Sequence, residues 1–166
     1  MRAFGITLAI AALSATGLMA QGRGTPPPTK LYSSSSDVAA LIAEAKAEHK
    51  EGQPLQTKRL LSLNPIAANL EYRTGVAVAA VHETEAEMFY VIDGSATMVT
   101  GGKLTEEKRT NPENLSGAGI EGGNAREIAK GDFVIVPQGM PHWFSKINGT
   151  LVLMAVHVPR TTGEGK

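Results

Sequence analysis

Most of this chain consists of short apolar runs separated by turn residues, and this pattern limits the fold more than any other feature. From Leu55 onward the runs are broken by glycine, proline and asparagine, and no second helical pattern interrupts them. Many short strands with turn signals predict an antiparallel sandwich or barrel. The candidate strands are residues 55–63, 69–73, 76–82, 87–92, 95–99, 126–128, 133–136, 142–147 and 151–158.

Two turn signals within this region predict hairpins. Asp93–Gly94 and Asn148–Gly149 each lie between apolar runs, and such pairs are preferred in two-residue hairpin turns. Residues 100–125 are polar and rich in glycine. A stretch of that length without clear periodicity predicts a lid, a mouth loop or a disordered segment.

The first twenty residues differ in composition from the rest. Arg2 gives a basic start, and residues 3–20 are apolar apart from a few small polar side chains. This pattern predicts a secretory signal peptide over residues 1–20. The alternative is an uncleaved membrane anchor, because the apolar stretch approaches the length that spans a bilayer. In both cases we expect the folded part to lie outside the cytoplasm, in a bacterial periplasm. If the signal is cleaved, we expect no stable membrane insertion.

A linker and one helix precede the strands. Residues 21–35 are rich in proline, glycine and serine, which predicts a flexible linker. Residues 36–54 predict a helix with Ser36 as its N-cap, and its single apolar stripe predicts packing against a larger element. The apolar positions at helical spacing are Val38, Leu41, Ile42 and Ala45. The two remaining predicted segments are a barrel over residues 55–160 and a tail over residues 161–166.

Charge and composition exclude several classes of function. Lys plus Arg and Asp plus Glu are equal at 16 each in 166 residues, so no basic field exists to bind nucleic acid. The chain has no cysteine, which excludes disulfides, thiolate metal sites and cysteine nucleophiles.

Three side chains fit together as one set of metal ligands. His82 ends one candidate strand, Glu87 begins the next, and His142 follows the turn at Pro137–Gly139. Strand alternation puts Glu87 on the apolar face of its strand. A buried carboxylate without a partner is costly, and a cation beside two imidazoles would remove that cost. Such a set can ligate a first-row divalent metal and leave positions open.

The spacing of these residues resembles the two signature motifs of the cupin superfamily. The first motif has a His-x-His pair, three or four residues, Glu, six residues and Gly; His82, Glu87 and Gly94 match its second half. The second motif has Gly, five residues, Pro-x-Gly, two residues and His, then three residues and Asn. It is matched by Gly131, Pro137, Gly139 and His142.

Two positions depart from the cupin motifs. Ala80 stands in the place of the first histidine, and Lys146 stands in the place of the final asparagine. The usual set of three histidines and one glutamate is therefore reduced to His82, Glu87 and His142.

The resemblance implies an all-β fold, a single small jelly-roll barrel of the cupin type with a short N-terminal α-helix, and a homodimer. It also implies a divalent metal, Fe, Mn, Ni or Zn, and a small-molecule ligand or substrate. Because Ala80 removes one usual ligand, two functions stay open. The first is an exported metal-dependent enzyme acting on a small organic molecule, with dioxygenase, isomerase and lyase chemistry not distinguished. The second is a non-catalytic cupin that binds a sugar or organic acid without metal.

His157 is a further candidate for the site. It shares one strand face with Leu151, Leu153 and Ala155, but the opposite face is apolar too, so alternation does not say which face is inside. If it points inward, His157 could replace the ligand lost at Ala80 or act as a general base near the metal. The alternative is a strand-end histidine satisfied by water or backbone. The residues expected to line a substrate pocket are Ala80, Phe89, Val91, Phe144 and Arg73, the last as an anion-binding group.

Overall fold

The computed structural model describes residues 28–159, so the predicted signal peptide and tail, and residues 21–27 of the predicted linker, lie outside the described residues. Within this range no helix has the length and apolar character needed to span a bilayer. The elements are α1 (Ser35–Glu48), β1 (Leu55–Leu63), β2 (Ile66–Arg73), β3 (Ala79–His82), β4 (Glu85–Thr100), β5 (Lys103–Thr105), β6 (Lys108–Asn111), β7 (Asn114–Gly117), β8 (Gly119–Glu121), β9 (Asn124–Ala129), β10 (Phe133–Val136) and β11 (His142–Pro159).

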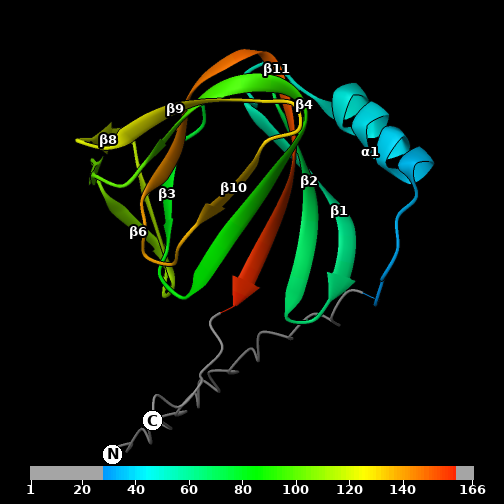
Figure 1. Cartoon of the computed structure of the whole chain (residues 1–166), viewed down its shortest axis with the longest axis horizontal. Coiled ribbons are helices and arrows are strands. Elements are labelled where there is room, and N and C mark those ends of the chain that lie inside the picture. Colours follow the sequence, from blue (N-terminus) through cyan, green and yellow to red (C-terminus); the bar gives the residue numbers. More distant parts are fainter. Residues whose placement is uncertain (1–27, 160–166) are drawn as a thin grey trace, which may run out of the picture.

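Two long antiparallel strands, β4 and β11, organise the barrel. Their pairing runs from Pro159 opposite Glu85 to His142 opposite Thr100. β11 also pairs with β2 and β3, and β4 also pairs with β9 and β10, so four of the other seven strands of the large sheet are joined directly to one of these two. The strands curve around a common interior, and α1 lies outside them beside β1 and β2 (Figure 1). The predicted all-β jelly-roll with one N-terminal helix is confirmed.

Both predicted hairpins are wrong, because the chain does not reverse at either site. Asp93–Gly94 lies inside β4 and Asn148–Gly149 lies inside β11. Gly94 and Gly149 have φ of 84° and 75°, the conformation that a hairpin turn also requires. Here it accompanies a shift in register between Ile147 and Leu151. The two glycines therefore bend a pair of strands together, as β-bulges do.

The predicted long loop over residues 100–125 is also wrong. This segment forms four short strands, of which β5 and β8 make a separate two-stranded sheet. β7 pairs with β3 and sets Asn114 opposite His82. The polar composition that suggested a loop reflects exposure, since every residue of β6 is exposed.

The helix begins earlier than predicted, with Ser34 in place of Ser36 as the N-cap. The Ser34 hydroxyl accepts a hydrogen bond from the Asp37 amide at 3.1 Å, and the Asp37 carboxylate accepts one from the Ser34 amide at 2.9 Å. This reciprocal capping box satisfies two amides at the helix start. Just before it, within the predicted linker, Lys30 exchanges two backbone hydrogen bonds of 2.9 Å with Ser62.

Helix α1 packs on one face of β2 and β11, and the barrel interior lies on the opposite face. On the outer face, Ala45 of α1 packs with Leu70, Tyr72 and Val152, as expected from its apolar stripe. On the inner face of β11, three residues join the barrel core. They are Leu151, Leu153 and Ala155. Because His157 shares their side of the strand, its face is the inner one.

Candidate metal centre

His82, Glu87 and His142 meet inside one end of the barrel. His82 is the last residue of β3, Glu87 lies near the start of β4, and His142 begins β11. One ligand atom from each lies within 4.8 Å of the others. The Nε2 atoms of His82 and His142 are 3.2 and 3.0 Å from Glu87 Oε2. The three residues grouped from the sequence are therefore brought together by the fold.

The Pro-x-Gly turn places His142 beside the end of β3. The Gly139 amide donates a hydrogen bond of 2.7 Å to the carbonyl of His82, and Gly139 has φ of 72°, a conformation that favours glycine. Three residues later His142 starts β11, where it pairs with Ala80 of β3. The turn therefore holds the two imidazole-bearing strand ends next to each other.

Glu87 is ionised although its side chain is only 5% exposed. Burial raises the pKa of Glu87, but its interactions with the imidazoles of His142 and His82, and the charges of His142 and His157, outweigh burial and hold the pKa well below its ordinary value. A buried negative charge requires positive charge nearby. This requirement is the first sign that the cluster suits a cation.

The second sign is the surroundings of Glu87 Oε2. This buried oxygen accepts no hydrogen bond of proper geometry within residues 28–159, although two ring nitrogens approach it closely. Buried acceptors are almost always satisfied, and an exception requires an explanation such as an ion. Two ring nitrogens and a carboxylate oxygen that converge in this way have the arrangement of ligands around a divalent metal. The residues present therefore fit such an ion.

The other ring nitrogens of these histidines face acceptors. His82 Nδ1 lies 2.7 Å from Asn114 Oδ1, and His142 Nδ1 lies 3.4 Å from the Met140 carbonyl. A hydrogen on Nδ1 leaves the Nε2 lone pair free to ligate, and contacts of this kind orient metal-binding histidines. Burial lowers the pKa of His82, but Glu87, Asn114 and the charge of Glu85 raise it by more, so the pKa ends above its ordinary value. Protons therefore compete with a metal for this imidazole.

His157 also reaches the cluster. Its Nε2 lies 3.3 Å from Glu87 Oε1 and its Nδ1 lies 3.0 Å from Glu85 Oε2. The rings of His157 and His82 are 4.7 Å apart. The alternative of a strand-end histidine satisfied by water or backbone is wrong, because both ring nitrogens face carboxylates.

Four of the five predicted pocket residues lie next to the cluster or beneath it. Phe89, Val91 and Phe144 are 1%, 0% and 3% exposed, and the ring of Phe89 is 6.0 Å from that of His142. These three side chains form an apolar floor that is closed to solvent. Ala80 pairs with His142 across the sheet.

Arg73 is not brought to the cluster. Its guanidinium lies 4.5 Å above the ring of Phe144 and pairs with Glu71 at 2.7 Å. In the β2–β11 register Arg73 is opposite Leu151, whereas His157 is opposite Ala67. Six residues along a strand span about 20 Å, so Arg73 lies toward the other end of the barrel. Its guanidinium still reaches the apolar floor at Phe144, and its predicted contact with a substrate stays a prediction.

Two residues of the site were missed in the sequence. Glu85, beside His157, lies two positions before Glu87 on β4, so strand alternation could have placed both carboxylates on one side. Asn114, beside His82, lies in the segment expected to be a loop, and no sequence pattern marked it as a site residue.

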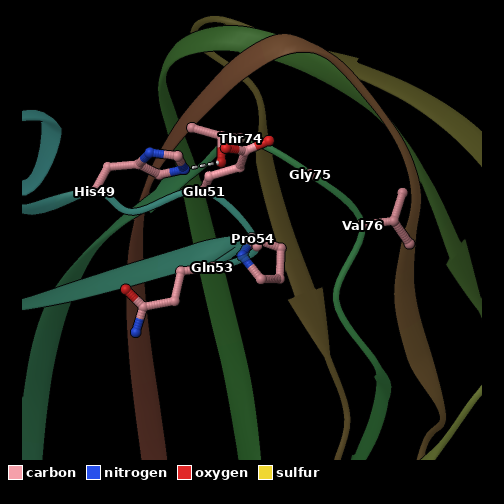
Figure 2. A pocket seen from close by; sticks show the side chains of 8 residues that line it. His49, Glu51, Gln53, Pro54, Thr74, Gly75 and Val76 are labelled. Carbon is pink, nitrogen blue, oxygen red and sulfur yellow. Dashed lines mark hydrogen bonds between the residues drawn. The ribbon is translucent and has the colours of Figure 1, made fainter.

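A surface depression lies away from the cluster, at the C-terminal end of α1. Its volume is about 430 Å³, and its lining includes His49, Thr74 and Val76 (Figure 2). His49 Nε2 and Thr74 Oγ1 are 2.6 Å apart, so the fourth histidine of the chain is bound to a hydroxyl outside the cluster. This makes His49 a useful control residue in the experiments below.

The fold and the cluster together define a class of protein: an antiparallel β-barrel with histidines and a glutamate gathered inside one end. The chain belongs to the cupin family, whose family model, described as Cupin, matches residues 46–161. No curated protein matches the chain.

Solved structures with similar folds have low sequence identity to this chain. Protein BH2720 of Bacillus halodurans has 14% identity and a TM-score of 0.50, with 87% of this chain and 89% of that chain covered. The Cnp3 cupin domain of Schizosaccharomyces pombe has 16% identity and a TM-score of 0.48, covering 69% and 72%. KdgF from Halomonas sp. has 16% identity and a TM-score of 0.49, covering 68% and 87%. At these identities the similarity concerns the fold alone.

Proposed function

We propose that this protein is an exported cupin that binds a divalent metal and acts as an enzyme on a small organic molecule. His82, Glu87 and His142 would hold the metal. The observation that carries the proposal is the ionised, buried Glu87, whose Oε2 faces two imidazole Nε2 atoms without accepting a hydrogen bond. Nitrogen and oxygen donors of this kind suit Fe, Mn, Ni or Zn. When bound, such an ion supplies a Lewis acid or a redox centre.

Exposure indicates the side from which a small molecule would approach. The side chain of His82 is 19% exposed and that of His157 is 27% exposed, whereas those of Glu87 and His142 are 5% and 7% exposed. The apolar floor of Phe89 and Phe144 closes the opposite side. A substrate would therefore enter past His82 and His157, and the floor would keep water away from the inner side of the site.

A second function, binding of a small molecule without metal, is favoured by Ala80. The side chain of Ala80 offers no donor atom, so the cupin set lacks one of its usual ligands on β3. A site that only binds a sugar or organic acid requires no metal-supported chemistry. The two functions differ in whether the purified protein holds metal.

The test is the metal content of the mature protein, purified without a metal-affinity tag. We expect close to one equivalent of a first-row metal by elemental analysis in the wild type. His142→Ala should lose nearly all of it, because the variant removes one imidazole and leaves Glu87 with one fewer partner. His49→Ala removes an imidazole outside the cluster and should keep the metal. A wild type that holds none, even after reconstitution with each candidate metal, would favour the second function.

Metal occupancy should also depend on pH. The imidazoles must be neutral to ligate, and the raised pKa of His82 lets protons compete from a higher pH than for a free histidine. Occupancy at limiting metal should therefore be high well above neutral pH and begin to fall before the pH reaches about 6.5, the ordinary pKa of histidine. Equilibrium dialysis across this range measures it. Constant occupancy down to about pH 4 would argue against imidazole ligands.

Export to a periplasm and a homodimeric state are parts of the same proposal. The basic start and apolar run of residues 1–20 support export. Phe133 and Ile135 on β10, which are 68% and 65% exposed, support a dimer, because exposed apolar groups of this size commonly mark interfaces. Cell fractionation and light scattering of the mature protein test the two points separately.

A further inference from the structure

We propose that His157 is a fourth protein ligand of the same metal and that Glu85 is its positioning residue. This inference rests on the proposed metal site, and it assigns that site a ligand from the last strand of the barrel. It would restore the number of ligands that Ala80 reduces, with the imidazole supplied by β11 in place of β3.

The pairing of β4 with β11 brings His157 close to Glu87. His157 and Glu87 are direct cross-strand partners in the β4–β11 pairing, and both side chains point into the barrel. The two carboxylate oxygens face different imidazoles. Oε2 faces the Nε2 atoms of His82 and His142 at 3.2 and 3.0 Å, and Oε1 faces the Nε2 atom of His157 at 3.3 Å. Three of the four histidines of the chain therefore aim the same ring atom at one carboxylate.

The partner of Nδ1 decides what His157 Nε2 can do. Glu85 Oε2, 3.0 Å from His157 Nδ1, is a carboxylate oxygen and accepts a hydrogen bond. Of the two carboxylate contacts of the ring, only this one has hydrogen-bond geometry; the contact of Nε2 with Glu87 at 3.3 Å does not. The hydrogen of a neutral His157 ring therefore lies on Nδ1, and the lone pair lies on Nε2, toward Glu87. A carboxylate that accepts from the outer nitrogen of a histidine is the usual orienting partner of a metal-bound imidazole.

The same tautomer holds for all three histidines. Asn114 Oδ1 and the Met140 carbonyl face the Nδ1 atoms of His82 and His142, so each neutral ring presents its Nε2 lone pair to the centre. Three lone pairs and one carboxylate then converge without a hydrogen among them. Such a set repels itself unless a cation sits among its members. His82, Glu87 and His142 already bring ligand atoms within 4.8 Å of one another, and His157, whose Nε2 faces the other oxygen of Glu87 at 3.3 Å, would add a third nitrogen to this set.

A general base would place different demands on His157. A base must keep its Nε2 lone pair for a substrate proton and is not required to bind the metal. Removing a base therefore leaves metal affinity and the number of bound imidazoles unchanged. Removing a ligand changes both. Metal-binding measurements, independent of any enzymatic activity, separate the two roles.

The experiment uses the mature protein with Co²⁺ as the probe. X-ray absorption of the Co²⁺-loaded wild type should show three imidazoles, and His157→Ala should show two. Its Co²⁺ affinity, measured by competition with a chelator, should fall about 100-fold. Glu85→Gln should keep three imidazoles but lose affinity by about 10- to 100-fold, as partners of metal ligands do. His49→Ala, the matched control, should change neither quantity.

The same variants separate three causes of failure: misfolding, a wrong assignment of His157, and absence of the proposed metal site. If His157→Ala does not fold, His157→Gln keeps a polar side chain of similar reach that can donate to Glu85, and it should show the same loss. Two imidazoles in the wild type, or unchanged affinity in a folded His157 variant, would overturn the assignment of His157 alone. A wild type that binds no Co²⁺ would overturn the metal site itself.

Discussion

Replacing Glu87 with glutamine should lower metal affinity by about 100-fold or more. Structural zinc sites with four ligands bind with about 10–16 kcal/mol, which averages about 3 kcal/mol for each ligand, or about two orders of magnitude. Glu87 is the proposed ligand toward which three of the four imidazoles point, and the one that brings negative charge. Glutamine keeps the size of the side chain and removes that charge. The loss of binding free energy should therefore be at least the average value for one ligand. Chelator competition with Zn²⁺ or Co²⁺ measures it.

Glu83→Gln is the matched control for this experiment. Glu83 lies in the turn between β3 and β4, its side chain is 37% exposed, and it pairs with Arg109 at 2.6 Å. The substitution removes the same charge close to the site without touching the cluster. Its metal affinity should stay within about twofold of wild type, because exposed charges are screened by solvent. Equal losses in the two variants would mean that Glu87 acts through general electrostatics and is not a ligand.

Replacing Gly94 with alanine should destabilise the fold by about 4 kcal/mol or more, at the upper end of single substitutions. Gly94 has φ of 84°, which costs an alanine about 1–2 kcal/mol by itself. An added Cβ would also lie 2.0 Å from the Thr150 carbonyl oxygen and 3.1 Å from Leu151 Cα. Both are backbone atoms of the paired strand, so β4 and β11 would have to separate. Urea unfolding of the metal-free protein measures the change.

Gly149→Ala isolates the part of this cost that comes from the close approach. Gly149 lies in the same bend, has a similar φ of 75°, and has no atom within 4 Å of an added Cβ. Only the cost of the positive φ applies, so the free energy of unfolding should fall by about 1–2 kcal/mol. Similar losses in the two variants would show that β11 moves aside and that the strands are not held as closely as described.

The grouping of His82, Glu87 and His142 could be predicted because their spacing resembles the two cupin motifs, and local rules support it. Strand alternation puts Glu87 on the same side as Phe89 and Val91, and the Pro-x-Gly turn sets where His142 begins its strand. Neither step requires knowledge of which strands are neighbours. The barrel class follows from composition and turn spacing in the same way.

The features that were wrong depend on the partner strand. Asp-Gly and Asn-Gly indicate a positive φ, which both a hairpin and a bulge require, and only the β4–β11 pairing decides between them. The inner face of β11 was ambiguous because α1 covers its outer face at Val152, which makes both faces apolar. Arg73 shares the interior with the cluster, but its distance along the barrel is set by its register with Leu151.

Strand β11 carries two of the proposed ligands and also joins β2, β3 and β4 in one sheet. It follows β3 and β4 in the chain, so a partly synthesised polypeptide that lacks β11 has His82 and Glu87 but neither His142 nor His157. Such an intermediate also lacks the strand that connects the two sides of the barrel. Loading of the ion should therefore come after the final strand docks, and a bound metal would stabilise the finished barrel without nucleating its formation.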